Sequence, residues 1–213
     1  MEKEHTDSFW DDLRVSANMV AVSGSQFTQP PAWTRILFNK ERGPSFSGLY
    51  GYTFEHDRYD RGMIQNAHFH AQLPHRYKEN TPIEPHVHVR LDPYSEGEPG
   101  QHLLLEFEYS WTNIGEQRSE SSSIISINYE VTADDLTADN LLISFGRITK
   151  EKSQISSMLD CRFSRITFDP GWGKDFWTPQ GLSNDTFKGN MVFKEFDFHY
   201  QVDTPGSKEI YTK

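Results

Sequence analysis

Residues 102–111 read His-Leu-Leu-Leu-Glu-Phe-Glu-Tyr-Ser-Trp and decide the fold class. Leu105, Phe107 and Tyr109 fall on one face of this stretch, and the two glutamates fall on the other. Because side chains alternate across a β-strand, this pattern predicts a half-buried strand and not a helix. This strand candidate indicates a sheet with one packed face and one polar face.

The same alternation recurs along the rest of the chain, between turns rich in Gly, Pro, Asn and Asp. Many short strands with regular turns are typical of a sandwich or barrel. Residues 7–14, 132–140 and 150–157 could be helical, but none is long enough to carry a fold. We therefore expect an all-β, jelly-roll-like antiparallel β-sandwich with short helical segments. The other expected strands are 33–39, 48–55, 64–73, 86–91, 123–131, 141–149, 158–168 and 191–202.

The domain organisation follows from the absence of a Pro/Ser-rich linker and of internal repeats in the 213 residues. We expect one β-sandwich domain over residues 16–213, preceded by an N-terminal arm over residues 1–15. The first residues of the arm are charged and lack strand alternation, so they cannot bury enough surface to order themselves. Trp10 is expected to anchor the arm, either on its own sandwich or on a neighbouring subunit or other protein. The alternative is that this segment is an ordinary first strand packed into the domain's own core.

Composition excludes several classes of partner. Lys and Arg total 21 against 31 Asp and Glu, which gives a formal net charge of -10. Such a chain repels nucleic-acid phosphates and anionic membrane surfaces, so we expect neither partner. No stretch approaches the length of a membrane span, and the N-terminus lacks an apolar leader. The single cysteine, Cys161, excludes an internal disulfide and is expected to be an inert buried thiol.

Histidines are the residues most suggestive of chemistry. His68 and His70 share a face of one expected strand, and His86 and His88 share a face of the next. If these two strands pair, four imidazoles converge and are candidate ligands for a divalent metal. The alternative is that the histidines form hydrogen bonds in a polar seam, because neutral imidazole offers one donor and one acceptor.

A cupin-like metal enzyme is a further alternative. His86 and His88 are followed by Asp92, as in the first half of a cupin motif. The second half would need a histidine after Gly173, Pro179 and Gly181, but Asn184 stands at that position. Phosphate loops and nucleophile elbows are also absent from the sequence, so we expect a protein that is not an enzyme and that needs no cofactor.

Four segments resemble, in the same order, a family of tailed-bacteriophage virion proteins. Residues 73–88 read LPHRYKENTPIEPHVH, similar to the family's PHxYK and PHVH blocks. Residues 105–115 end in WTNIG, and residues 198–209 contain DTPGS, like the family's WxNIG strand and DTxGS tail. The opening WDDLRV at residues 10–15 also fits the family's N-terminal segment.

The resemblance implies a non-catalytic virion structural protein with a jelly-roll-like body. It implies a capsid decoration (cement or head-fibre) role, a homotrimer, and the major capsid protein or other virion proteins as partners, with a capsid protein as an alternative anchor for the arm. A glycan-binding tail or attachment module is the alternative, with Trp172 and Trp177 as candidate sugar-stacking residues. We also expect one spatial cluster formed by His75, Tyr77, His86 and His88 on two adjacent strands. The expected structural or interface residues are Trp10, His75, Tyr77, Lys78, His86, His88, Trp111 and Asn113.

Overall fold

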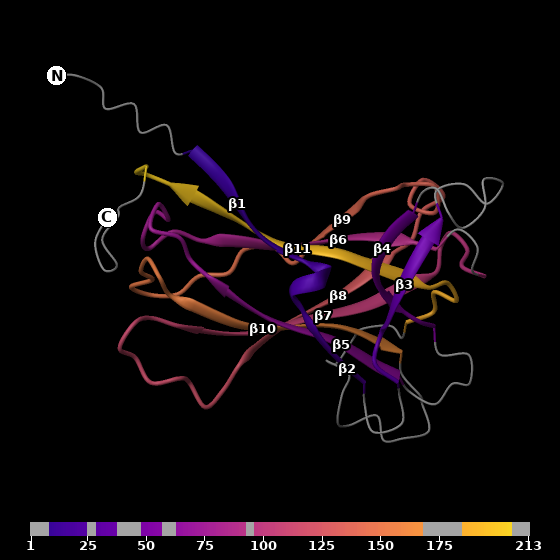
Figure 1. The fold of residues 1–213 in the computed structure, drawn as a ribbon, viewed down its shortest axis with the longest axis horizontal. Coiled ribbons are helices and arrows are strands. Elements are labelled where there is room, and N and C mark those ends of the chain that lie inside the picture. The colour runs from indigo at the N-terminus through magenta and orange to yellow at the C-terminus, as the bar shows by residue number, and fades with distance from the viewer. Residues whose placement is uncertain are drawn as a thin grey trace.

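Two antiparallel β-sheets pack face to face, one above the other in Figure 1. The computed structural model describes residues 9–24, 29–37, 48–56, 63–92, 96–167 and 185–205. Sheet A has the order β3 (Ala32–Leu37), β4 (Gly48–Phe54), β11 (Met191–Val202), β6 (Ile83–Leu91), β9 (Leu141–Ser144), with β1 (Phe9–Ser16) also paired to β11. Sheet B has the order β2 (Ala21–Gly24), β5 (Met63–Gln72), β10 (Met158–Thr167), β7 (His102–Thr112), β8 (Ser123–Glu130). The predicted antiparallel sandwich is therefore confirmed.

The expected strands are all present, with bounds close to those predicted. The main differences lie in β6 and β9, which pair with each other. β6 begins at Ile83 and runs through Pro85, which has no N–H but accepts a hydrogen bond on its carbonyl from the Phe145 backbone. β9 ends at Ser144 because Gly146 adopts a positive φ of 76° and turns the chain away.

The three expected helical segments are wrong. Residues 9–16 form β1, and residues 132–140 and 150–157 form turns. Lys152 and Ser156 have positive φ angles of 54° and 59°, which a right-handed helix cannot contain. Within the described ranges, the helical element is a single 3₁₀ turn, η1 (Ala17–Met19), which carries the chain from β1 to β2.

Strand β1 corresponds to the alternative in which the arm is an ordinary first strand of the sandwich. It pairs with β11 over its whole length, from Phe9 opposite Val202 to Ser16 opposite Glu195. Val15 is buried in the core, and Trp10 stacks on the His199 ring of β11 with centroids 4.8 Å apart. The segment that holds Trp10 is thus a strand of this sandwich.

An aromatic cluster fills the space between the sheets. Phe196 lies at its centre, with ring centroids 4.8 Å from Phe107 and 4.9 Å from Phe69. Cys161 is buried as predicted, and burial raises the pKa of its thiol, which keeps the thiol protonated at neutral pH. The described residues include no helix long and apolar enough to cross a membrane.

Candidate functional site

The outer face of sheet A contains an open groove with a volume of about 840 Å³. Its walls come from β1, β4, β6, β9 and β11, and most of its side chains are polar or charged. This lining differs from that of pockets for apolar small molecules, which consists mainly of hydrophobic side chains. The lining residues are Asp12, Arg14, Tyr50, Glu84, His86, His88, Asn140, Leu142, Ser144, Lys194, Glu195, Asp197 and His199.

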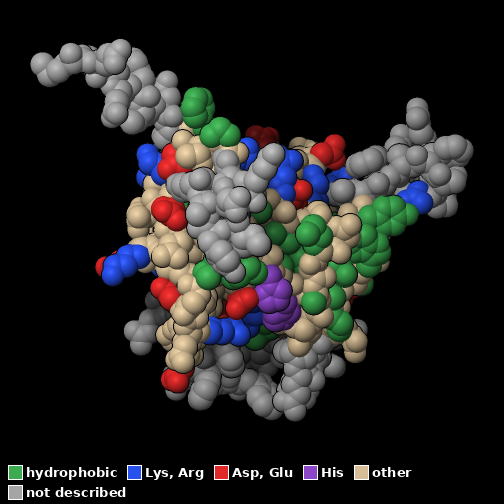
Figure 2. Space-filling model, turned by 60° about the vertical axis from the view of Figure 1, so that its left-hand side comes forward, with side chains coloured by type: hydrophobic (Ala, Val, Ile, Leu, Met, Phe, Trp, Pro, Cys, Tyr) green, Lys and Arg blue, Asp and Glu red, His purple; other side chains and the backbone are tan. Residues whose placement is uncertain are grey.

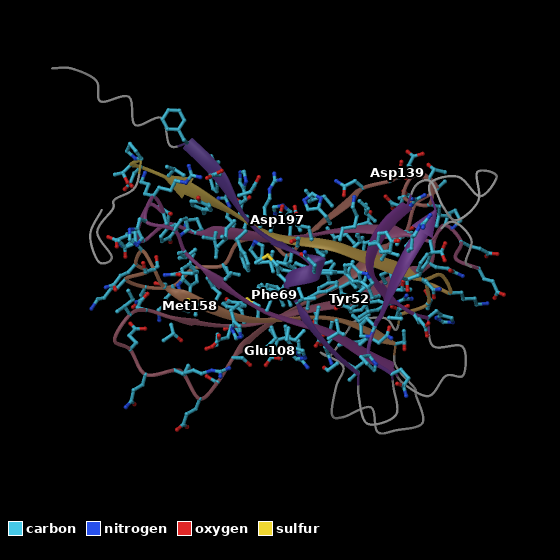
Figure 3. The ribbon with its side chains drawn as sticks, viewed as in Figure 1. Tyr52, Phe69, Glu108, Asp139, Met158 and Asp197 are labelled. Carbon is cyan, nitrogen blue, oxygen red and sulfur yellow. The ribbon has the colours of Figure 1, made fainter. Side chains whose placement is uncertain are left out.

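Strand register brings these side chains together. Asp197 of β11 lies directly opposite His86 of β6 and, on its other side, opposite Arg14 of β1. Because side chains alternate along each strand, every second residue of β6 and β11 points into the groove while the residues between them enter the core. Figure 3 shows Asp197 on one side of the core residue Phe69 and Glu108 on the other side.

A β-bulge at Lys194 shapes the groove. The pairing of β11 with β6 shifts between Phe193 and Glu195, so Lys194 is the extra residue. The bulge lies where the partner of β11 changes from β4 to β1. It lets Phe193 and Phe196 both enter the core, and the Lys194 ammonium donates to the Asn140 side-chain oxygen at 2.9 Å.

Two imidazoles and one carboxylate meet at the floor of the groove. The Nε2 atoms of His86 and His88 lie 3.7 Å and 3.4 Å from the same Asp197 oxygen, Oδ2. The three side chains are 12%, 19% and 3% exposed, respectively. Their ligand-capable atoms all lie within 4.8 Å of one another.

Burial determines the protonation states of Asp197 and His86. Burial, reinforced by the neighbouring Glu195 carboxyl, raises the pKa of Asp197 to about 7. Burial also lowers the pKa of His86, because an imidazolium is poorly solvated there. The floor of the groove therefore holds a neutral His86 at neutral pH, beside a carboxyl group that loses its proton near that pH.

The rim of the groove carries aromatic rings. Tyr50 lines it and is 51% exposed. Trp10 stacks almost parallel on His199, at 9° between ring planes, and His199 is hydrogen-bonded to Asp12 at 2.7 Å. Acidic, basic and histidine side chains lie side by side on the part of the face in Figure 2 that is coloured by type.

The expected convergence of four histidines is wrong. His68 and His70 lie on β5 in sheet B, whereas His86 and His88 lie on β6 in sheet A. His68 is hydrogen-bonded to Ser23 at 2.8 Å and His70 to Asp160 at 2.6 Å. The first pair of histidines thus belongs to a polar network on the opposite outer face of the sandwich.

The carboxylate partner also differs from the cupin pattern. Asp92 follows the end of β6, and its backbone N–H donates to the Asn190 carbonyl. The carboxylate beside His86 and His88 is Asp197, which local spacing could not identify because it comes from β11. The sequence feature that could have identified Asp197 is the alternation of β11. It places Asp197 on the outer, polar face, between the buried residues Phe196 and Phe198.

β5 and β6 belong to different sheets, so the expectation that the strands flanking His75 and Tyr77 are adjacent is wrong. Tyr77 is fully buried, and its ring lies beside Trp111 and Tyr200, with centroids 6.5 Å and 6.3 Å away. His75 lies in the turn before Tyr77 and is partly buried.

The PHxYK and WTNIG segments instead meet at one end of the sandwich, through the turns at residues 150–157. The Tyr77 hydroxyl donates to the Thr81 carbonyl and lies 2.8 Å from the Ser153 hydroxyl. Asn113 donates to the Lys152 carbonyl and accepts a hydrogen bond from Ser157 at 2.7 Å. The Lys78 backbone N–H donates to Gln201 of β11. These contacts give the motif residues a structural role.

We expect Tyr77→Phe to lower the free energy of unfolding by about 1–3 kcal/mol, because the buried Ser153 hydroxyl and the partly buried Thr81 carbonyl lose a partner. Denaturant titration measures the change. Tyr50→Phe is the control, since the exposed Tyr50 should shift stability by less than about 0.5 kcal/mol. Equal effects of the two substitutions would contradict the structural role of Tyr77.

Trp172 and Trp177, the candidate sugar-stacking residues, lie outside the described residues, as do residues 1–8 of the expected arm. The groove on sheet A was not anticipated as a site, although two of its histidines were.

Comparison with known proteins identifies no family. No family model and no curated protein sequence matches the chain. Among solved structures, the carbohydrate-binding module TmCBM61, in complex with β-1,4-galactotriose, aligns at 10% identity and a TM-score of 0.39, over 87% of this chain and 90% of that one. The enzymatically active domain of bacteriophage CBA120 tailspike protein 4 aligns at 8% identity and a TM-score of 0.33, over 91% of this chain and 19% of that one. This chain thus spans about a fifth of the tailspike chain, and likeness at this level says nothing about the ligand of the groove.

Proposed function

We propose that this chain is a glycan-binding structural component of a bacteriophage particle, without catalytic activity, and that the groove on sheet A binds the glycan. The virion setting is supported by the PHxYK, PHVH, WxNIG and DTxGS resemblance. The binding role is supported by one observation above all: an open, polar groove of about 840 Å³ on the outer face of sheet A. Capsid decoration, the more specific hypothesis from the sequence, stays a prediction.

The chemistry of the groove suits a sugar. Sugar hydroxyls need closely spaced donors and acceptors, and the lining supplies carboxylates, imidazoles, an amide and two cationic side chains. Sugar C–H faces pack on aromatic rings, and Tyr50 offers an exposed ring at this position. The groove thus combines both kinds of contact on side chains that project from paired strands.

The charge of the groove indicates whether a neutral or an acidic glycan fits it better. Four carboxyl groups line it, from Asp12, Glu84, Glu195 and Asp197, against two fixed cations, Arg14 and Lys194. Even with Asp197 protonated, the fixed charges sum to a negative value. We therefore infer that the groove prefers neutral oligosaccharides over sulfated or uronic ones.

An array of neutral and acidic bacterial surface oligosaccharides, probed with the full chain, tests the proposal. The expected result is binding to one group of neutral glycans, reduced about tenfold or more by Tyr50→Ala and by His199→Ala. That loss corresponds to about 1.4 kcal/mol, the size of one or two lost contacts.

His70→Ala is the matched control. Like His199, His70 is a histidine on the outer face of a sheet that is hydrogen-bonded to an aspartate, but it lies on sheet B. It should leave glycan binding unchanged. Binding that is lost in His70→Ala and kept in His199→Ala would move the site to the other sheet, and the absence of binding across the array would refute the proposal.

A further inference from the structure

The strongest chemical feature of the groove is the arrangement of His86, His88 and Asp197 around one point. We propose that these three side chains bind a divalent transition-metal ion, with Zn²⁺ as the first choice. This inference goes beyond glycan binding, and it holds whether or not the groove binds a sugar.

Comparison with the other His–Asp pairs of this protein supports the proposal. His199 with Asp12 and His70 with Asp160 are direct hydrogen bonds, at 2.7 Å and 2.6 Å. In contrast, His86 and His88 lie 3.7 Å and 3.4 Å from Asp197, which is too long for a good hydrogen bond. Two ligands of a tetrahedral Zn²⁺ with bonds of about 2.0–2.2 Å lie about 3.3–3.6 Å apart, which is close to the two His–Asp separations. All three ligand atoms lie within 4.8 Å of one another.

The outer contacts of the imidazoles suit metal binding. Nδ1 of His86 lies 3.2 Å from the Glu84 carbonyl, an acceptor, so Nδ1 carries the proton and Nε2 presents its lone pair. Nδ1 of His88 lies 3.0 Å from the Asn140 side-chain nitrogen and 3.2 Å from its oxygen, so the amide holds the ring through Nδ1 and leaves Nε2 facing Asp197. Lys194 fixes that amide with a hydrogen bond to the same oxygen. Ligating histidines in metalloproteins are held by such second contacts.

One oxygen of the buried Asp197 carboxyl group has no hydrogen-bond partner among the described residues. That oxygen is Oδ1, and the Asp197 side chain is 3% exposed. Its neighbour on the same strand, Glu195, is another carboxyl group, and the side-chain hydrogen bond between the two brings no positive charge to Asp197. A carboxylate buried in this way is costly unless a cation or a proton compensates its charge. A metal ion at this point would supply the missing charge.

The donor set indicates the class of metal. Imidazole nitrogens suit Zn²⁺ and its transition-metal neighbours, whereas Mg²⁺ and Ca²⁺ prefer sites made of oxygen atoms. Two imidazoles and one carboxylate supply three ligands, which leaves a fourth position for water or for an oxygen of a molecule in the groove.

Calorimetric titration of the chelator-treated full chain with Zn²⁺ tests the proposal, without any glycan present. We expect one Zn²⁺ per chain with micromolar or tighter affinity, no comparable response to Mg²⁺, and a rise in thermal midpoint on Zn²⁺ addition. His88→Ala should weaken binding by about 100-fold or more, and Asn140→Ala by about tenfold, as expected for a ligand and for an outer partner.

His70→Ala, on the opposite face, serves as the control and should bind Zn²⁺ like the unmodified chain. Circular dichroism establishes that each variant is folded, and His88→Ala removes a side chain at the groove surface, away from the core. Failure of the unmodified chain to bind Zn²⁺ would overturn the proposal, as would equal binding by His88→Ala and the unmodified chain. A loss of Zn²⁺ binding in His70→Ala alone would also overturn it. Glycan binding is measured separately, so either proposal can fail alone.

Discussion

Arg165→Met is expected to lower the free energy of unfolding by about 3–5 kcal/mol, which is the usual cost of removing one partner of a buried ion pair. Arg165 lies on β10, and its side chain is 1% exposed. Its guanidinium donates two hydrogen bonds to Asp185, at 2.9 Å and 3.0 Å. Asp185 has a side chain that is fully buried, so the substitution leaves its charge without compensation.

The same guanidinium also satisfies backbone carbonyls that have no access to water. It donates to Phe54 at the end of β4, and to Phe187 and Gly189 in the segment before β11. Arg165 therefore joins the two sheets to the chain that leads into the last strand. Arg165→Lys should recover little of the loss, because an ammonium group cannot reproduce this planar set of contacts.

Urea titration of the purified variants measures the effect. Arg147→Met is the matched control, because Arg147 also pairs with a carboxylate, Glu84, at 2.6 Å, but is 67% exposed. Exposed pairs contribute about 0.2–1 kcal/mol, so this variant should stay close to the unmodified chain. A loss below about 1 kcal/mol in Arg165→Met would mean that the buried pair does not stabilise the fold.

Phe196→Ala is the second substitution with a large expected effect, a loss of about 3–5 kcal/mol. Phe196 is fully buried, and its ring lies among Phe69, Phe107 and Phe198, with centroid distances from 4.8 Å to 5.3 Å. Removing the ring takes away its transfer free energy and leaves a cavity between two sheets whose strand pairing prevents them from closing over it.

Thermal and urea unfolding of Phe196→Ala, compared with Ile124→Ala, test this expectation. Ile124 lies on β8 and is 54% exposed, so its truncation should change stability by less than about 0.5 kcal/mol. If Phe196→Ala lost no more than Ile124→Ala, the aromatic cluster would not be the main source of stability.

The strands with clear alternation were predicted almost to the residue. Strand β11 matches its expected range, and β7 extends the expected range by one residue. Alternation is a local property, because each strand buries every second side chain, so it can be read from the sequence. Strand β1 was only one of two alternatives for its segment, because Asp11, Asp12 and Arg14 interrupt its apolar pattern. Its strand conformation comes from pairing with β11, almost the whole chain length away.

The candidate site likewise combines features that local alternation predicts with features that only the tertiary structure determines. Alternation correctly predicted that His86 and His88 share one face and that His68 and His70 share one face, but it could not assign a sheet to either pair. That assignment depends on the connection at residues 73–82, which carries the chain from sheet B to sheet A. A short loop favours neighbouring strands only as a tendency, and in a sandwich it can also cross between layers.

The sequence by itself determined the all-β class, the positions of most strands and the polar face on which His86 and His88 lie, because each of these follows from side chains a few residues apart. Only the tertiary structure brought Asp197 beside them, closed the groove with β1 and placed Tyr77 against Trp111 and Ser153. These contacts join residues far apart in the chain. Their partners are selected by strand order and by the bulge at Lys194, which arise only when both sheets pack around a common core.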